Sequence, residues 1–397
     1  MPTTSRALAT SAALVLAVAL GACDAAKEQP AAPAGGAETG GQPNAGGDAS
    51  ALRAAYDRGL DFLAKAQKDG KFEVQGAPHV GVTALAVAPF LNRPGGRRAS
   101  DTFVDASLAW IASKVGPDGS VEAEFSSNYE TSAAILALAA SRDAQYRPVI
   151  DRAAAYIKKL QYAEQGHPSY GGIGYGDDGP RSDLSNTYYS LASLKAAGVS
   201  PDDPVFQRAL VFLGRVQNRK ENETAGEPTQ WKGENGEAIV RGDDGGGYYY
   251  PGESKAGTDA LPDGTHVLRS YGSMTYTLLG CYHMAGLDRS DPRVAAAVEW
   301  VSKHWAVDRN PGMPPEQARL GLYYYYAAIG KTLPEVGLDT LETPSSGKVD
   351  WRAELSKTLL AAQRPDGSWA NDTARWMEAD PVLATAYALT ALRGCER

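Results

Sequence analysis

One pattern repeats along the chain: a threonine near the start of a run rich in alanine and leucine, which ends near a glycine or a polar break. It occurs five times, in residues 80–85, 129–134, 185–190, 272–277 and 383–388. Residues 317–330 occupy a sixth such place without the threonine. A unit that recurs in this way indicates a single body built by stacking similar pieces, rather than two or three unrelated domains.

Each of these runs follows an amphipathic segment whose apolar residues are three and four positions apart. Leu52, Tyr56, Leu60 and Leu63 mark the first of these segments, and Leu355 and Leu359 belong to the last. This spacing places the apolar side chains on one face of a helix. Alternating strand patterns are almost absent. We therefore predict an all-α body of six helix pairs, about twelve helices, over residues 51–397.

The turns within the pairs also recur. Residues 67–72 (QKDGKF) and 363–369 (QRPDGSW) share an Asp-Gly turn followed by an aromatic residue. Asp-Gly suits a turn because glycine accepts a positive φ at no steric cost. We interpret these turns as structural.

Residues 363–369 resemble the QW motif of the prenyltransferase and squalene-oxidase repeat. That superfamily includes squalene–hopene cyclases, other class II terpenoid cyclases and protein prenyltransferase β-subunits. The resemblance implies an (α/α)6 toroid of six helical hairpins, with inner helices around a central cavity and outer helices behind them.

The N-terminus is typical of an exported lipoprotein. Arg6 precedes an apolar run over residues 7–20, too short to span a membrane and suited to a signal peptide. The run ends in Leu-Gly-Ala-Cys at residues 20–23, which resembles the bacterial lipobox, so Cys23 is the predicted lipidated residue. The alternative is a plain secretory signal followed by a chance cysteine.

We accordingly predict a signal peptide over residues 1–22 and a lipidated, flexible linker over residues 23–50. The linker is made of Ala, Gly, Pro and polar residues, which bury too little apolar surface to offset the entropy of ordering. The protein is thus expected on the bacterial cell envelope, held to a membrane through Cys23 and facing the periplasm or the exterior.

Charge and cysteine content exclude other classes. Lys+Arg 39 against Asp+Glu 47 gives a net charge of −8, which opposes binding to nucleic acid. Three cysteines are too few for a disulfide framework. Cys281 and His283 lie two positions apart within one predicted helix, on different sides of it, so no zinc site and no cofactor is predicted.

The family resemblance implies that a cyclase protonates an alkene with the central acid of a DxDD motif. The nearest match is Asp183-Leu184-Ser185-Asn186, which keeps only the first acid. Glu130 precedes another inner-helix threonine without paired acids. Asp183 and Glu130 are therefore the candidate catalytic residues if the protein is an enzyme.

The predicted ligand-binding residues lie at the starts of inner helices and in one long connection. They are Tyr129, Ser185, Asn186, Arg269, Tyr271, Trp231 and Tyr248. The connection, residues 219–266, is interpreted as a lid over one mouth of the cavity, with a plain surface excursion as the alternative. Asp177-Asp178 and Asp243-Asp244 are acidic pairs in glycine-rich loops, read as solvated turns rather than Ca²⁺ ligands.

Three functions remain open. The first is a binding protein whose cavity holds a hydrophobic or isoprenoid molecule. The second is a terpenoid-cyclase-like enzyme with a non-standard acid. The third is a carbohydrate-active enzyme, since (α/α)6 toroids also carry such activities.

Overall fold

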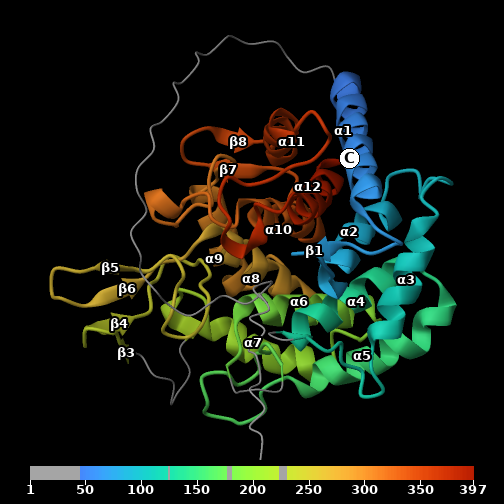
Figure 1. Cartoon of the computed structure of the whole chain (residues 1–397). Helices are drawn as coiled ribbons and strands as arrows, with labels where there is room; N and C mark the ends of the chain where they lie inside the picture. The colour runs from blue at the N-terminus through green and yellow to red at the C-terminus, as the bar shows by residue number, and fades with distance from the viewer. Residues whose placement is uncertain (1–44, 124–125, 177–180, 223–229) are drawn as a thin grey trace, which may run out of the picture.

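The structure is a computed structural model that describes residues 45–123, 126–176, 181–222 and 230–397 (Figure 1). Cys23 and the predicted signal peptide lie outside these residues, as do Asp177 and Asp178. The described chain contains twelve α-helices, which confirms the predicted all-α body of six pairs.

The helices alternate between an outer and an inner position. The outer helices are α1 (Ala45–Ala66), α3 (Phe103–Lys114), α5 (Arg147–Lys159), α7 (Pro204–Arg215), α9 (Pro292–Lys303) and α11 (Trp351–Ala362). The inner helices are α2 (Val80–Leu91), α4 (Ser127–Ala140), α6 (Leu184–Ala196), α8 (Gly272–Met284), α10 (Leu322–Glu335) and α12 (Pro381–Cys395). The first helix begins at Ala45, six residues before the predicted start of the body at residue 51.

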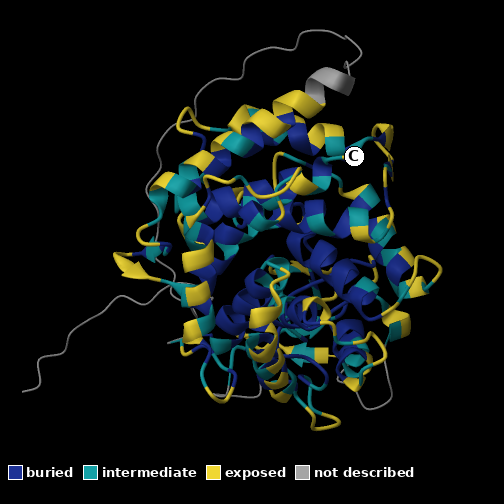
Figure 2. Cartoon of the chain, turned by 90° about the vertical axis from the view of Figure 1, so that its right-hand side faces the viewer, coloured by how far each residue is buried: buried dark blue, intermediate teal, exposed yellow. Residues whose placement is uncertain are grey.

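The inner helices form a closed ring. Each packs against the next inner helix, and α12 packs back against α2, so the last hairpin meets the first (Figure 1). The outer helices pack behind them, and exposed residues gather at the periphery while the inner helices are mostly buried (Figure 2). The fold is therefore an (α/α)6 toroid, as the resemblance implied.

The repeated threonine has a structural role in every hairpin that carries it. Its Oγ1 accepts a hydrogen bond from a backbone N–H of the preceding turn, and each of the five side chains is fully buried. The pairs are Thr83 with Phe72 (3.0 Å), Thr131 with Val121 (2.8 Å), Thr187 with Ile173 (3.0 Å), Thr275 with Gly247 (3.0 Å) and Thr385 with Trp369 (3.0 Å). The turn is thus tied to the inner helix that follows, and a buried N–H is satisfied.

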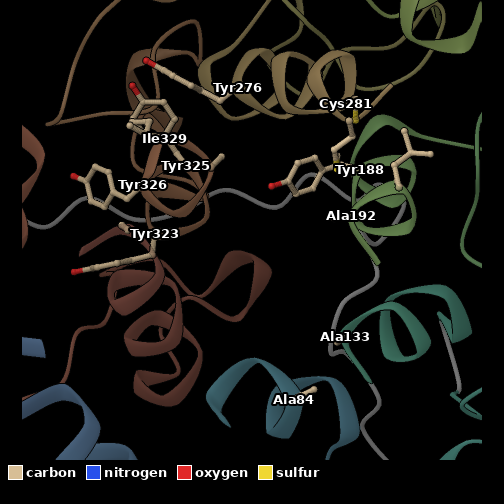
Figure 3. Close-up of a cluster of buried hydrophobic side chains, with 14 of the residues drawn as sticks. Ala84, Ala133, Tyr188, Ala192, Tyr276, Cys281, Tyr323, Tyr325, Tyr326 and Ile329 are labelled. Carbon is tan, nitrogen blue, oxygen red and sulfur yellow. The ribbon is translucent and has the colours of Figure 1, made fainter. Parts of the chain in front are cut away.

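Four consecutive tyrosines on α10 divide between the core and the ring centre. Tyr323, Tyr325 and Tyr326 are buried, and Figure 3 shows them projecting from α10 with Tyr276 of α8 beside Tyr325. The hydroxyls of Tyr325 and Tyr326 donate to the carbonyls of residues 306 and 307, at 2.8 and 2.5 Å. Of the four, Tyr324 alone stays half-buried.

The long connection before α8 holds a small sheet that the sequence pattern did not predict. Its strands are β3 (Gln230–Lys232), β4 (Ala238–Val240), β5 (Thr258–Ala260) and β6 (His266–Leu268), in the order β3-β4-β6-β5. The β4–β6 pair is parallel and the other two pairs are antiparallel. Strands of three residues are too short to display a period-2 pattern, which explains the difference.

The remaining elements are short. Two antiparallel hairpins are formed by β1 (Glu73–Val74) with β2 (Ala77–Pro78) and by β7 (Leu341–Thr343) with β8 (Gly347–Val349). Four 3-10 helices are η1 (Ala144–Tyr146), η2 (Lys220–Asn222), η3 (Pro315–Gln317) and η4 (Arg375–Met377). Within the described chain, no helix combines the length and the apolar character that crossing a membrane requires.

Candidate functional site

Buried carboxylates lie at the N-terminal ends of three alternate inner helices. Glu130 accepts a backbone N–H at the start of α2, Asp183 caps α6, and Glu378 accepts two at the start of α10. Helix N-termini favour negative charge because their first N–H groups lack intrahelical partners. This end of the ring is therefore where the structure concentrates its buried acids.

Asp183 is enclosed by hydrogen-bond donors. Oδ1 accepts from the backbone N–H of Asn186 (2.8 Å), and Oδ2 accepts from the Asn186 side chain (2.7 Å) and the Tyr249 hydroxyl (3.3 Å). Burial raises the pKa of Asp183, and these donors oppose that shift. Since the side chain has no exposed surface, the geometry favours an anchor for α6 over a group that meets a substrate.

Asn186 continues this network into α4. Its side-chain oxygen accepts from Asn128 Nδ2 (3.2 Å), which also donates to the Gly174 carbonyl (2.7 Å). The Asn128 oxygen accepts from Ser132 (3.0 Å) and Ser190 (2.9 Å). Asn186 thus belongs to a fully bonded polar seam between α4 and α6, and such seams fix how two helices pack.

Glu130 forms a pair with His79, the residue that caps α2. Its Oε2 accepts from the Gly81 backbone N–H (2.5 Å), and its Oε1 lies 3.3 Å from His79 Nε2. His79 Nδ1 accepts from the Val82 N–H (3.3 Å), so Nε2 carries the proton that faces Glu130. A Cβ at Gly81 would lie 3.0 Å from Oε1, so a glycine there leaves room for the carboxyl group.

The carboxyl group of Glu130 changes its charge near neutral pH. Burial raises the pKa of Glu130 to about 7, opposed by the hydrogen bond from Gly81. Burial lowers the pKa of His79 to about 4, so the imidazole is neutral where Glu130 titrates. A carboxyl group that changes charge near pH 7, beside a half-buried imidazole, is suited to proton transfer.

Glu378 is a buried acid that the sequence reading missed. It accepts from the backbone N–H groups of Tyr323 (3.2 Å) and Tyr324 (2.8 Å) and from the Asn371 side chain (2.8 Å), and burial raises its pKa. Two non-glycine residues before it, Trp376 and Met377, have φ of +55° and +62°. This strained backbone places Glu378 at the start of α10. A loop residue of this kind leaves no helical periodicity in the sequence.

Five inner helices each carry a large apolar or aromatic side chain within the helix that stays half-buried. These are Leu85 on α2, Leu136 on α4, Tyr189 on α6, Tyr324 on α10 and Tyr387 on α12. Protein surrounds the three tyrosines closely enough to raise the pKa of each. Because the outer helices cover the backs of the inner ones, we attribute the remaining exposure to the centre of the ring.

A chain of hydroxyl groups crosses four inner helices beside these side chains. Tyr129 donates to Ser185 Oγ (2.7 Å), Ser185 lies 3.4 Å from the Tyr324 hydroxyl, and Tyr324 lies 3.2 Å from Thr277 Oγ1. Thr277 donates to the Ser273 carbonyl (2.6 Å). Tyr129 donates at one end of this series and Thr277 donates to a carbonyl at the other, so every hydroxyl proton in the series is donated within the protein.

The tyrosine rings pack on one another along the same path. Tyr129 meets Tyr189 edge to face at 5.3 Å, Tyr189 stacks on Tyr324 at 6.4 Å, and Tyr324 meets Tyr387 at 5.9 Å. The structure therefore brings together the predicted residues Tyr129 and Ser185, whereas Asn186 lies in the buried seam between α4 and α6. It adds Tyr189 and Tyr387, which repeat periodicity alone did not single out.

The other predicted ligand-binding residues occupy different surroundings. Tyr271 is buried as the N-cap of α8, and Tyr248 is buried with its hydroxyl donating to the Arg215 carbonyl (2.5 Å). Arg269 follows β6 and its Nε donates to Asp259 (2.7 Å) at the sheet. Trp231 lies in β3, so it and Arg269 belong to the small sheet.

The described parts of the chain hold no cluster of three or more His, Cys, Asp or Glu side chains suited to a metal ion. Cys281 and Cys395 are buried free thiols, and burial raises the pKa of both. Asp244, from the acidic pair in the long connection, accepts from Ser270 (2.7 Å) and Trp300 (3.2 Å).

Known proteins resemble this chain in fold. No protein-family model and no curated protein matches it. Among solved structures, the type II terpene cyclase MstE from Scytonema, in complex with merosterolic acid A, superposes with a TM-score of 0.53 at 13% identity. The match covers 88% of this chain and 98% of that one.

A second similar structure comes from an enzyme that acts on a different kind of molecule. It is an inactive variant of an α-1,6-mannanase of Salegentibacter in complex with α-1,6-mannotetrose, with a TM-score of 0.51 at 11% identity. The match covers 87% of this chain and 99% of that one. At such identities the likeness establishes the toroid fold and leaves function to the site itself.

Proposed function

We propose that the toroid binds a small hydrophobic molecule, of the isoprenoid kind, at the centre of its ring. The observation that carries this proposal is the set of half-buried side chains on five inner helices, two leucines and three tyrosines. Binding sites for such molecules are mostly apolar and concave, with few polar groups.

The hydroxyl chain supports an apolar ligand over a sugar. Tyr129, Ser185 and Tyr324 use their protons within the protein, so they present ring edges and faces rather than free donors. A sugar-binding wall instead needs donors and acceptors left available to the ligand. The cyclase similarity is compatible with this ligand class, although it extends only to the fold.

This proposal predicts a bound molecule that depends on the Tyr324 ring. Organic extraction and mass spectrometry of the purified protein should recover a hydrophobic compound. Tyr324→Ala should reduce its recovery about tenfold, since a buried aromatic contact contributes on the order of 1.5 kcal/mol. Tyr324→Phe keeps the ring and should retain the compound.

Tyr162→Ala provides the matched control, because Tyr162 is half-buried at the periphery with its hydroxyl bonded to Glu164. Circular dichroism checks that each variant is folded. Recovery of nothing from the parent protein, or equal recovery from Tyr324→Ala, would contradict ring-centre binding.

We further propose that the protein is an exported lipoprotein. A signal peptide covers residues 1–22, and a linker that starts at the lipidated Cys23 leads to α1. The support is the lipobox at residues 20–23 after an apolar run of signal length. A tether of this kind would hold the ring near a membrane, where hydrophobic small molecules partition.

Cys23→Ser tests the lipoprotein proposal. The variant should leave the membrane fraction and lack the mass of attached acyl chains, because a serine hydroxyl cannot form the thioether. Cell fractionation and intact mass spectrometry measure both properties. Retention of acyl mass in the variant would exclude Cys23 as the site.

A second function, an acid–base enzyme of the cyclase-like kind, is favoured by one observation. Glu130, with its pKa raised to about 7, faces neutral His79 at 3.3 Å. In this proposal Glu130 delivers or removes a proton and His79 orients it. Asp183 anchors α6 and takes no part, since its carboxyl group is enclosed.

A further inference from the structure

A pocket of about 430 Å³ lies outside the ring centre, beside the small sheet. It is lined by His167, Arg181, Trp231, Lys232, Tyr250 and Glu253, among others. Arg181 comes two residues before Asp183, and Tyr250 follows the Tyr249 that bonds to it, so the pocket adjoins the N-terminal end of α6.

An aromatic platform forms one part of the pocket. The backbone at Gly252 lies against the Trp231 ring, since a Cβ there would come within 2.6 Å of the indole. Arg181 lies over the Tyr250 ring at 5.1 Å, which fixes the guanidinium beside the platform. Trp231 is half-buried, as expected of a ring that keeps part of its surface for a ligand.

Two hydrogen-bond donors of this pocket have no partner among the described residues. The indole Nε1–H of Trp231 and the Nε–H of Arg181 are both shielded from solvent and make no hydrogen bond. Buried donors are nearly always satisfied, and an unsatisfied one costs free energy. Both belong to side chains that line one pocket, so a ligand that brings acceptor atoms there would complete them.

The charged groups favour an anionic ligand. Glu253 is already paired with Arg181 and Lys255. Lys232 is exposed at the pocket, so the lining carries more positive than negative charge. Guanidinium and ammonium groups bind carboxylates through charge-assisted hydrogen bonds.

We propose that this pocket binds an acidic saccharide. One pyranose ring of the saccharide stacks on Trp231, oxygens of a neighbouring sugar unit accept from the two unpartnered N–H groups, and a carboxylate pairs with Lys232 and Arg181. This site is separate from the ring centre and does not depend on the hydrophobic ligand proposed there.

Titration of the full chain with trigalacturonate, followed by tryptophan fluorescence and calorimetry, tests the proposal. Binding in the millimolar range or tighter is expected, and the fully methyl-esterified trisaccharide, which has the same rings without the charge, should bind at least about tenfold more weakly. Trp231→Ala should weaken trigalacturonate binding by about tenfold or more, because it removes both stacking and the donor. Trp231→Phe should weaken it about threefold, because it removes only the donor.

Trp305→Phe is the matched control, since its indole donates to Glu354 on the exposed surface away from the pocket. Lys232→Gln, on an exposed strand position, should weaken binding of the acid and leave the ester unaffected. Equal affinity for acid and ester would overturn the anionic ligand. No binding of either, or unchanged binding by Trp231→Ala, would overturn the site.

Discussion

Replacing Gly394 by alanine is expected to destabilise the toroid by about 3 kcal/mol or more. Gly394 lies on α12 against Gly330 of α10, and an added Cβ would come 1.8 Å from the Gly330 carbonyl oxygen and 2.6 Å from its Cα. Both obstacles are backbone, so no side chain can move aside. The two helices must separate, and the inner ring depends on their close contact.

Gly214→Ala is the matched control within a helix. Among the described residues, a Cβ at Gly214 of α7 would meet only the Asn222 side chain, at 3.8 Å. Alanine favours helix over glycine by up to about 1 kcal/mol, so this variant should be neutral or slightly stabilised. Urea unfolding followed by circular dichroism compares the two. Equal stability of both variants would mean that α10 and α12 are not in backbone contact.

The fold was predictable because every repeat meets the same physical requirements with the same kinds of residue. Each inner helix needs an apolar face, and each turn needs an acceptor for a buried N–H, so the threonines and the apolar spacing recur together. The same reasoning failed for β3 to β6, since three-residue strands are set by pairing with neighbours.

The site was less predictable, because position at a helix start does not say which way a side chain faces. Tyr129 and Ser185 meet near the ring centre, whereas Tyr248, chosen for its place in the long connection, is a buried structural residue. Glu378 follows a strained loop that has no periodic signal. His79, the N-cap of α2, becomes informative only beside Glu130, 51 positions later in the sequence and 3.3 Å away in space.

Glu130→Gln should change how stability depends on pH, and the change separates the two members of the pair. Burial raises the pKa of Glu130 from 4.5 to about 7, so the buried carboxylate lowers stability above pH 7 and this penalty disappears as pH falls to 4.5. Burial lowers the pKa of His79 from 6.5 to about 4, so its contribution is full above pH 6.5 and is lost toward pH 4.

In the parent protein these two effects oppose each other between pH 4.5 and 6.5, so the pair contributes a nearly flat profile there. Glu130→Gln removes the gain in stability that protonation of Glu130 gives the parent protein at acid pH. Its stability relative to the parent should therefore fall by about 3 kcal/mol between pH 7.5 and 4.5, and His79→Gln should shift the opposite way by a similar amount. Urea unfolding of variant and parent at both pH values measures this difference. The contributions of the other titrating groups are the same in both proteins and cancel. A constant difference for Glu130→Gln would mean that Glu130 stays ionised throughout, as a cap of α2 without acid–base capacity near neutral pH.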